Sequence, residues 1–242
     1  MRLTILSAGA AQALVTELAE ALRTPGGIEI EATFGAVGAM KEKLLEGSPC
    51  DVIILTHAQI AELSQQGRVP SDSVADLGQV RTGVAVREGD AHPAVDTPAA
   101  LRDALIMAGA IYFPDPLKAT AGIHFMKVLD GLGMGAALEA RLRPHANGAA
   151  AMRALAASTE SRPIGCSQIT EIHYIPGVAL IAPLPKQFEL ATIYSAAVCS
   201  DALAPEAARR FVQQLTGDAS RKLRLRAGFE FTPGDTGTAG RS

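Results

Sequence analysis

The sequence predicts an α/β protein with mostly parallel sheets. Short apolar runs alternate with helical patterns along nearly the whole chain, and this alternation is typical of strand–helix–strand units. Hydrophobic residues make up 48% and charged residues 19% of the 242 positions, as in soluble globular proteins. At about 150 residues per domain, this length corresponds to one large domain or two small lobes.

The strand candidates are short apolar or alternating runs bounded by turn residues. Strict alternation of polar and apolar residues marks Ile28–Thr33, whereas Val52–Leu55 is apolar throughout. Continuous apolar runs of this length fit strands that are buried on both faces of a parallel sheet. The eight candidates are Leu3–Leu6, Ile28–Thr33, Val52–Leu55, Val80–Val86, Ile111–Phe113, Ile164–Ser167, Val178–Ala182 and Ala191–Val198.

Helix candidates lie between these strands. One apolar face is formed by Leu14, Leu18 and Leu22, and a second by Val37, Met40 and Leu44. Further helices are expected from Thr97-Pro98, Thr120 and Asn147 as starting signals, from Pro205 to a stop at Gly217, and in a basic segment with Arg221, Lys222, Arg224 and Arg226. We expect the Gly/Thr-rich tail, 232–242, to be disordered.

Composition excludes several classes of partner. The net charge is 22 − 25 = −3 and aromatic residues are 4% with no Trp, so neither a basic field nor a base-stacking platform is expected for nucleic acid. No apolar run is long enough to span a membrane. Cys50, Cys166 and Cys199 lie far apart and are interpreted as small buried hydrophobes, with one disulfide as the alternative. The five histidines have no metal-binding spacing. We therefore expect a monomer without metal or cofactor.

The first residues have two interpretations. Arg2, the run Leu3–Ala11 and the segment Ala11-Gln12-Ala13 imitate a signal peptide with its cleavage site. Thr4, Ser7 and Gly9 interrupt the apolar run, which favours a strand that turns into a helix. We expect a periplasmic protein if a signal peptide precedes this chain, and a cytoplasmic protein otherwise.

One histidine has a distinctive place. His57 follows the apolar run Val52–Leu55 and therefore lies at the carboxyl end of a strand, the edge where open α/β sheets bind ligands. A structural or helix-capping role remains open beside a functional one. In contrast, the glycine-rich segment Gly131–Gly135 follows a helix rather than a strand, so we interpret it as a helix end and turn rather than a nucleotide loop.

Small residues gather at four strand–helix junctions. Each junction presents backbone N–H groups at a helix N-terminus, where anions are attracted, and small side chains let an anion approach the backbone. Ordinary turn chemistry is the alternative explanation. The four turns are Ser7-Ala8-Gly9-Ala10, Gly35-Ala36-Val37-Gly38, Lys118-Ala119-Thr120-Ala121-Gly122 and Ser167-Gln168-Ile169-Thr170.

A family resemblance rests on an ordered set of segments that includes these turns. The segments are Leu3–Ala10, Thr33–Leu44, Cys50–Ile54, Thr82–Val86, Thr120–Gly122 with the helix to Gly133, Ile164–Thr170, Ala182–Pro185, Tyr194–Val198, Pro205–Leu215 and Ala227–Phe229. From Leu3 to Phe229 the sequence resembles type II periplasmic solute-binding proteins, in the branch similar to molybdate-binding proteins. A bacterial aconitate isomerase also resembles this branch.

The resemblance implies a two-lobe fold. Each lobe is a mostly parallel sheet flanked by helices, two crossover segments join the lobes, and the ligand lies in the cleft between them. Carried over, lobe one is 1–81 plus 191–242 and lobe two is 82–190. The family's ligand contacts map onto Ser7, Ala36, Val37, Ala121 and Gln168. The other candidate ligand-binding residues, which neighbour these contacts or supply charge, are Gly9, Ala10, Gly38, Arg81, Lys118, Thr120, Gly122 and Thr170.

The chain departs from the molybdate-binding pattern at two turns. Molybdate-binding members usually carry a second Ser where this chain has Gly35–Gly38, and often a Tyr where it has Gln168. Arg81 and Lys118 supply positive charge instead, and an arginine fork suits a carboxylate. These differences favour an organic di- or tricarboxylate, with a molybdate-like oxyanion as the alternative.

Two functions follow from the resemblance. The first is a binding protein that closes over a small anion and presents it to an ABC-type permease. The second is an isomerase, similar to aconitate isomerase, that moves an allylic proton of a tricarboxylate. In that case Arg81 and Lys118 would clamp carboxylates, and His57, Lys118, Glu171 or His124 would be the base.

Overall fold

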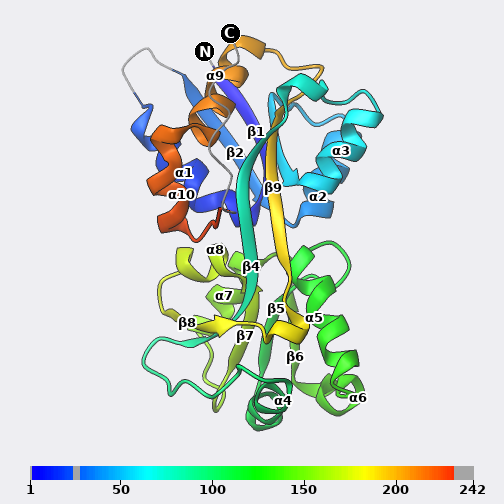
Figure 1. Cartoon of the computed structure of the whole chain (residues 1–242), viewed down its shortest axis with the longest axis vertical. Helices are drawn as coiled ribbons and strands as arrows, with labels where there is room; N and C mark the ends of the chain where they lie inside the picture. The colour runs from blue at the N-terminus through cyan, green and yellow to red at the C-terminus, as the bar shows by residue number, and fades with distance from the viewer. Residues whose placement is uncertain (1, 24–27, 232–242) are drawn as a thin grey trace. The chain divides into compact units, whose positions relative to one another are not determined.

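The structure is a computed structural model that describes residues 2–23 and 28–231 (Figure 1). The chain divides into two compact units. Unit 1 comprises the described residues of Met1–Phe34, Met40–Val80 and Thr192–Ser242, and unit 2 comprises Gly35–Ala39 and Arg81–Ala191. The lobe boundaries expected from sequence stay a prediction, and the tail 232–242 lies outside the described residues.

Unit 1 contains a mixed sheet in the order β2-β1-β3-β9-β4. β1 and β3 are parallel, with Ser7 opposite Ile54, and β9 runs antiparallel to β3. In Figure 1, α1 and α10 lie on one side of this sheet, and α2 and α3 lie on the other. The elements are β1 (Arg2–Ala8), the 3-10 turn Gly9–Ala11, α1 (Gln12–Ala21), β2 (Glu29–Gly35), α2 (Val37–Leu45), β3 (Val52–Thr56), α3 (His57–Gln65), the 3-10 turn Ser71–Ser73, the first part of β4 (Ala75–Arg87), β9 (Ala191–Val198), α9 (Pro205–Thr216), the 3-10 turn Asp218–Ser220 and α10 (Arg221–Ala227).

Unit 2 contains a second mixed sheet in the order β4-β7-β5-β6, with β8 paired to β4. β5 is parallel to β6 and β7, whereas β7 and β8 are antiparallel to β4. The elements after β4 are α4 (Pro98–Met107), β5 (Ile111–Pro114), α5 (Thr120–Gly131), α6 (Gly135–Leu138), the 3-10 turn Glu139–Arg141, β6 (Leu142–His145), α7 (Gly148–Ala156), β7 (Ile164–Gln168), α8 (Ile169–Tyr174), β8 (Val178–Pro183) and the 3-10 turn Lys186–Phe188.

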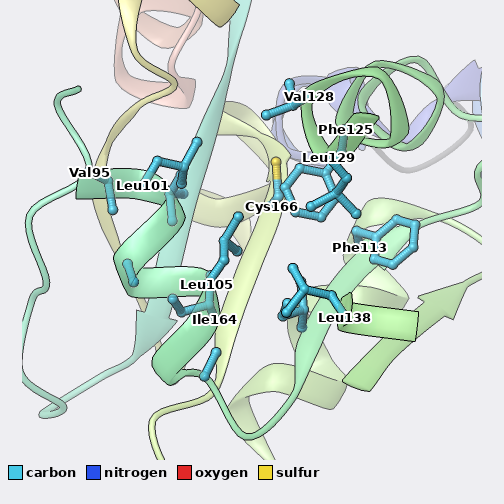
Figure 2. Packing of buried hydrophobic residues seen from close by; sticks show 14 of the residues in the cluster. Val95, Leu101, Leu105, Phe113, Phe125, Val128, Leu129, Leu138, Ile164 and Cys166 are labelled. Carbon is cyan, nitrogen blue, oxygen red and sulfur yellow. The ribbon is translucent and has the colours of Figure 1, made fainter. Parts of the chain in front are cut away.

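Strand alternation builds two cores in unit 2. Successive strand residues point to opposite faces of a sheet, so Ile111 and Phe113 enter one cluster while Tyr112 enters the other. The first cluster packs α4, α5 and α6 against the sheet, and Figure 2 shows Phe113 and Phe125 meeting within it. The second cluster is covered by α7 and α8. The unit 2 sheet is thus buried on both faces, as the apolar runs predicted.

Most of the helices and strands that the sequence predicted are confirmed, although several begin or end at other residues than expected. Thr97 and Asn147 cap α4 and α7 by accepting the backbone N–H of Ala100 and Ala150, as expected. The predicted capping role of Thr120 is wrong: α5 begins at Thr120 itself, with Ala119 at the N-cap and no side-chain cap. The short strand β6 and the helices α3 and α6 were not anticipated, whereas α8 begins at the strand–helix junction that the sequence predicted at Ser167–Thr170. All three cysteines are free and buried, which confirms their structural interpretation.

Candidate functional site

In unit 1, the turn after β1 has the small, buried character that the sequence predicted. Ser7 is fully buried and its Oγ donates to the carbonyl oxygen of Ala8 at 3.0 Å. Gly9 and Ala10 follow in a buried 3-10 turn. Neither this turn nor α1 begins with a side-chain cap, in contrast to α3, which is capped by Thr56. The first backbone N–H groups here are therefore not engaged by a capping side chain.

His57 belongs to a cluster of three polar side chains in unit 1. Its Nδ1 lies 2.9 Å from Asp76 Oδ1 and 3.1 Å from Ser195 Oγ. Ser195 Oγ donates to the same Asp76 oxygen at 2.5 Å. Ser195 is fully buried, whereas the side chains of His57 and Asp76 are 54% and 50% exposed. The sequence singled out His57, but its partners come from β4 and β9 and carried no local signal.

In unit 2, the loop before α5 is held closely. Asp115 Oδ1 accepts the backbone N–H groups of Leu117 and Lys118 at 2.7 and 2.9 Å. The carbonyl oxygen of Lys118 accepts the backbone N–H of Gly38 at 2.9 Å, so two of the predicted turns meet. A Cβ atom on Gly122 would lie 2.2 Å from the carbonyl oxygens of Pro114 and Asp115. Gly122 therefore lets the first turn of α5 pack against the end of β5.

Buried polar groups gather at the end of β7. Gln168 is 2% exposed, and neither its Oε1 nor its Nε2 has a hydrogen-bond partner among the described residues. The same holds for the Oγ1 atoms of Thr82 and Thr170, each in a side chain that is about as buried. Thr82 is the register partner of Gln168 across β4 and β7. Because buried polar groups are normally satisfied, this set is suited to hydrogen-bond a ligand.

A buried carboxyl lies one turn beyond Gln168. Glu171 accepts a hydrogen bond from Ser167 Oγ at 2.6 Å and from the backbone N–H groups of Gln168 and Gly148. A Cβ on Gly148 would lie 1.8 Å from Glu171 Oε2, so only glycine fits the start of α7 here. Burial raises the pKa of Glu171 above its usual range, although these three hydrogen bonds act in the opposite direction.

The raised pKa of Glu171 predicts a pH-dependent stability. A carboxyl whose pKa is higher in the folded than in the unfolded protein stabilises the fold below the unfolded pKa, about 4.3, and this contribution is lost as pH rises through the folded pKa. Relative to Glu171→Gln, wild-type protein should therefore lose unfolding free energy between pH 4.5 and pH 8. Urea unfolding at both pH values measures this difference. The exposed Glu139→Gln should show no such trend, and a constant wild-type-to-variant difference at Glu171 would refute the assignment.

The site residues predicted from sequence lie partly in unit 1 and partly in unit 2. Ser7, Gly9, Ala10 and His57 lie in unit 1, and the predicted binding residues from Arg81 onward lie in unit 2. The segment with Ala36, Val37 and Gly38 groups with unit 2. Unit 2 brings Gly38 to Lys118, and Thr82 to Gln168. That the turns of both units share one ligand stays a prediction. The sequence did not single out Thr82, Asp76, Gly148 or Ser195 as members of these groupings.

Two absences characterise the part of the chain that the structure describes. No helix there combines the length and apolar character needed to cross a bilayer. Within residues 2–23 and 28–231, no group of three His, Cys, Asp or Glu side chains is arranged to hold a metal ion.

Comparisons with known proteins agree with this architecture. A curated relative named aconitate isomerase, from a Pseudomonas species, is 28% identical over 230 residues, which are 91% of this chain and 85% of the relative. The fold is similar to a periplasmic molybdate-binding protein of Azotobacter vinelandii, with a TM-score of 0.77, 19% identity and coverage of 95% and 99% of the two chains. It is also similar to the sulfate-binding protein SubI of Mycobacterium tuberculosis, with a TM-score of 0.72, 16% identity and coverage of 97% and 88%.

These likenesses confirm the type II periplasmic-binding-protein fold that the sequence predicted. The model of a family described as bacterial extracellular solute-binding protein matches residues 3–230, which is nearly the whole chain. This chain belongs to the family of bacterial extracellular solute-binding proteins.

Proposed function

We propose that this protein binds a small organic anion with two or three carboxylates and delivers it, in the periplasm, to an ABC-type permease. The observation that carries the proposal is the group of buried polar side chains of Thr82, Gln168 and Thr170, whose polar atoms have no hydrogen-bond partner within the described part of the chain. Membership of a family of extracellular binding proteins supports the binding role and the periplasmic location.

The chemistry of these side chains favours an organic ligand over a bare oxyanion. A tetrahedral oxyanion offers only acceptor atoms, which would satisfy Gln168 Nε2 and the two hydroxyls but not the carbonyl oxygen of the amide. An organic acid with a hydroxyl or a protonated carboxyl also provides a donor for Gln168 Oε1. Leaving that oxygen buried and unpaired would cost about 1–3 kcal/mol.

Positive charge and helix ends supply the remaining requirements of an anion site. Arg81 is half-buried and directly precedes Thr82, and Lys118 lies two residues before α5. The twelve-residue helix α5 begins without a side-chain cap. Its first N–H groups and its dipole favour a carboxylate near Thr120, Ala121 and Gly122.

Arg81→Gln is expected to weaken binding of a tricarboxylate such as citrate by about 10- to 100-fold, since a hydrogen-bonded charge contributes about 1.5–3 kcal/mol. The measurement is the rise in melting temperature across a citrate titration. Arg102→Gln, an exposed substitution on α4 with the same charge change, should respond like wild type. Equal citrate affinity in all three proteins would remove Arg81 from the site.

A second candidate function is isomerisation of a tricarboxylate by an allylic proton shift. The relative named aconitate isomerase matches nearly the full length of this chain, and unit 1 holds a histidine beside a carboxylate. A purified protein that binds cis- or trans-aconitate without interconverting the two would support the binding role alone.

A further inference from the structure

His57, Asp76 and Ser195 form a hydrogen-bonded cluster in unit 1. We propose that it is a proton-transfer device, in which His57 carries the proton while Asp76 and Ser195 position the imidazole. This inference rests on the proposed isomerase function, and it adds two residues, Asp76 and Ser195, to which neither the sequence nor the comparisons assign a role.

The hydrogen bonds of the cluster determine which ring nitrogen of His57 is the base. Ser195 Oγ donates its single hydroxyl proton to Asp76 Oδ1, and the two oxygens lie 2.5 Å apart. An ionised Asp76 can only accept, so the contacts of His57 Nδ1 at 2.9 and 3.1 Å require Nδ1 to carry a proton. In the neutral imidazole, Nε2 is then the unprotonated nitrogen. A carboxylate that holds Nδ1–H in this way prepares Nε2 to accept a proton.

The position of the cluster fits a ligand-facing role. His57 directly follows β3, and Ser7 on the neighbouring parallel strand β1 is in register with Ile54. The Ser7 turn and His57 therefore leave the unit 1 sheet at the same carboxyl edge, where α/β sheets bind ligands. Because the His57 and Asp76 side chains are half exposed, their contact would contribute only about 0–1 kcal/mol to stability. A purely structural role explains the cluster less well.

The proposed step is balanced without any co-reactant. His57 Nε2 removes one proton from the methylene carbon of an unsaturated tricarboxylate, and the electron pair of that C–H bond forms a new double bond to the central carbon. The electrons of the old double bond move to the former vinyl carbon, which takes the proton back from His57. One C–H bond breaks and one forms, with no net oxidation or reduction. Asp76 stabilises the imidazolium between these events.

The test is proton exchange with deuterium oxide. Wild-type protein incubated with trans-aconitate should incorporate deuterium at the methylene carbon and form cis-aconitate, both followed by NMR. His57→Ala should lower kcat at least 100-fold with KM within about threefold, as expected for a group that acts in the transition state. Added imidazole should restore part of the exchange. His92→Gln, an exposed histidine on a loop of unit 2, is the matched control and should behave like wild type.

The positioning role is tested separately. Asp76→Asn keeps an oxygen acceptor but removes the charge, so kcat should fall at least tenfold while KM stays unchanged, and Asp76→Glu should recover part of the loss. The exposed Asp72→Asn, with the same charge change, should have no effect. Melting temperatures of all variants verify that they fold.

The outcomes separate this inference from the binding proposal. If wild-type protein is stabilised by an aconitate isomer but catalyses no exchange, the proton-transfer role is overturned and the binding function stands. Normal turnover by His57→Ala or Asp76→Asn would also overturn it, with the base lying elsewhere. If neither an aconitate isomer nor citrate stabilises wild-type protein and no exchange occurs, the proposed function and this inference both fail.

Discussion

Gly122→Ala is expected to lower the free energy of unfolding by about 3 kcal/mol or more and to remove ligand binding. The added methyl group would lie 2.2 Å from two backbone carbonyl oxygens, those of Pro114 and Asp115. Backbone atoms at the end of a buried strand cannot rotate away as a side chain can, so the first turn of α5 would have to move off β5. Urea unfolding and a citrate titration measure the two effects.

Gly135→Ala is the control for this substitution. A Cβ at Gly135, the first residue of α6, would lie 3.4 Å from Asp130 Oδ1, which is ordinary contact. Its unfolding free energy should stay within about 1 kcal/mol of wild type, since alanine is also the better helix former. If the two variants were equally stable, the close approach of α5 to β5 would be wrong.

Gln168→Met is expected to have opposite effects on stability and on binding. It removes a buried amide that has no hydrogen-bond partner among residues 2–23 and 28–231, while keeping a side chain of similar length. The ligand-free protein should therefore gain about 1–3 kcal/mol of unfolding free energy. The same change removes a donor and an acceptor from the proposed site, and affinity for a tricarboxylate should fall at least tenfold. Urea unfolding without ligand and calorimetric titration with citrate measure the two quantities.

Gln214→Met, an exposed substitution on α9, should change the unfolding free energy by less than about 0.5 kcal/mol and leave affinity intact. A Gln168→Met protein that is less stable than wild type yet binds normally would show that the amide serves the fold rather than a ligand.

Local patterns were sufficient to predict much of this fold. Apolar runs such as Val52–Leu55 placed β3 to within one residue, because a strand buried on both faces must be apolar throughout. Asn147 was predicted as a cap from its residue type alone, since the capping hydrogen bond involves a residue only three positions away. Signals of this kind are contained in a few consecutive residues.

The parts that sequence could not predict depend on distant segments. Asp76 and Ser195 meet His57 only because β3, β9 and β4 are neighbours in one sheet. Gly148 must be glycine because Glu171, over twenty residues later, occupies the place of its side chain. The helix α3 was not predicted, although Thr56, which caps it, has the residue type of an N-cap.

Titration calorimetry of the wild-type protein is the most direct test of the binding proposal. Citrate, both aconitate isomers, molybdate and sulfate would be titrated in the same buffer. We expect a tricarboxylate to bind with a dissociation constant at least 100-fold lower than that of either oxyanion. If molybdate or sulfate binds more tightly than every tricarboxylate, the proposed organic-anion specificity of this protein is contradicted.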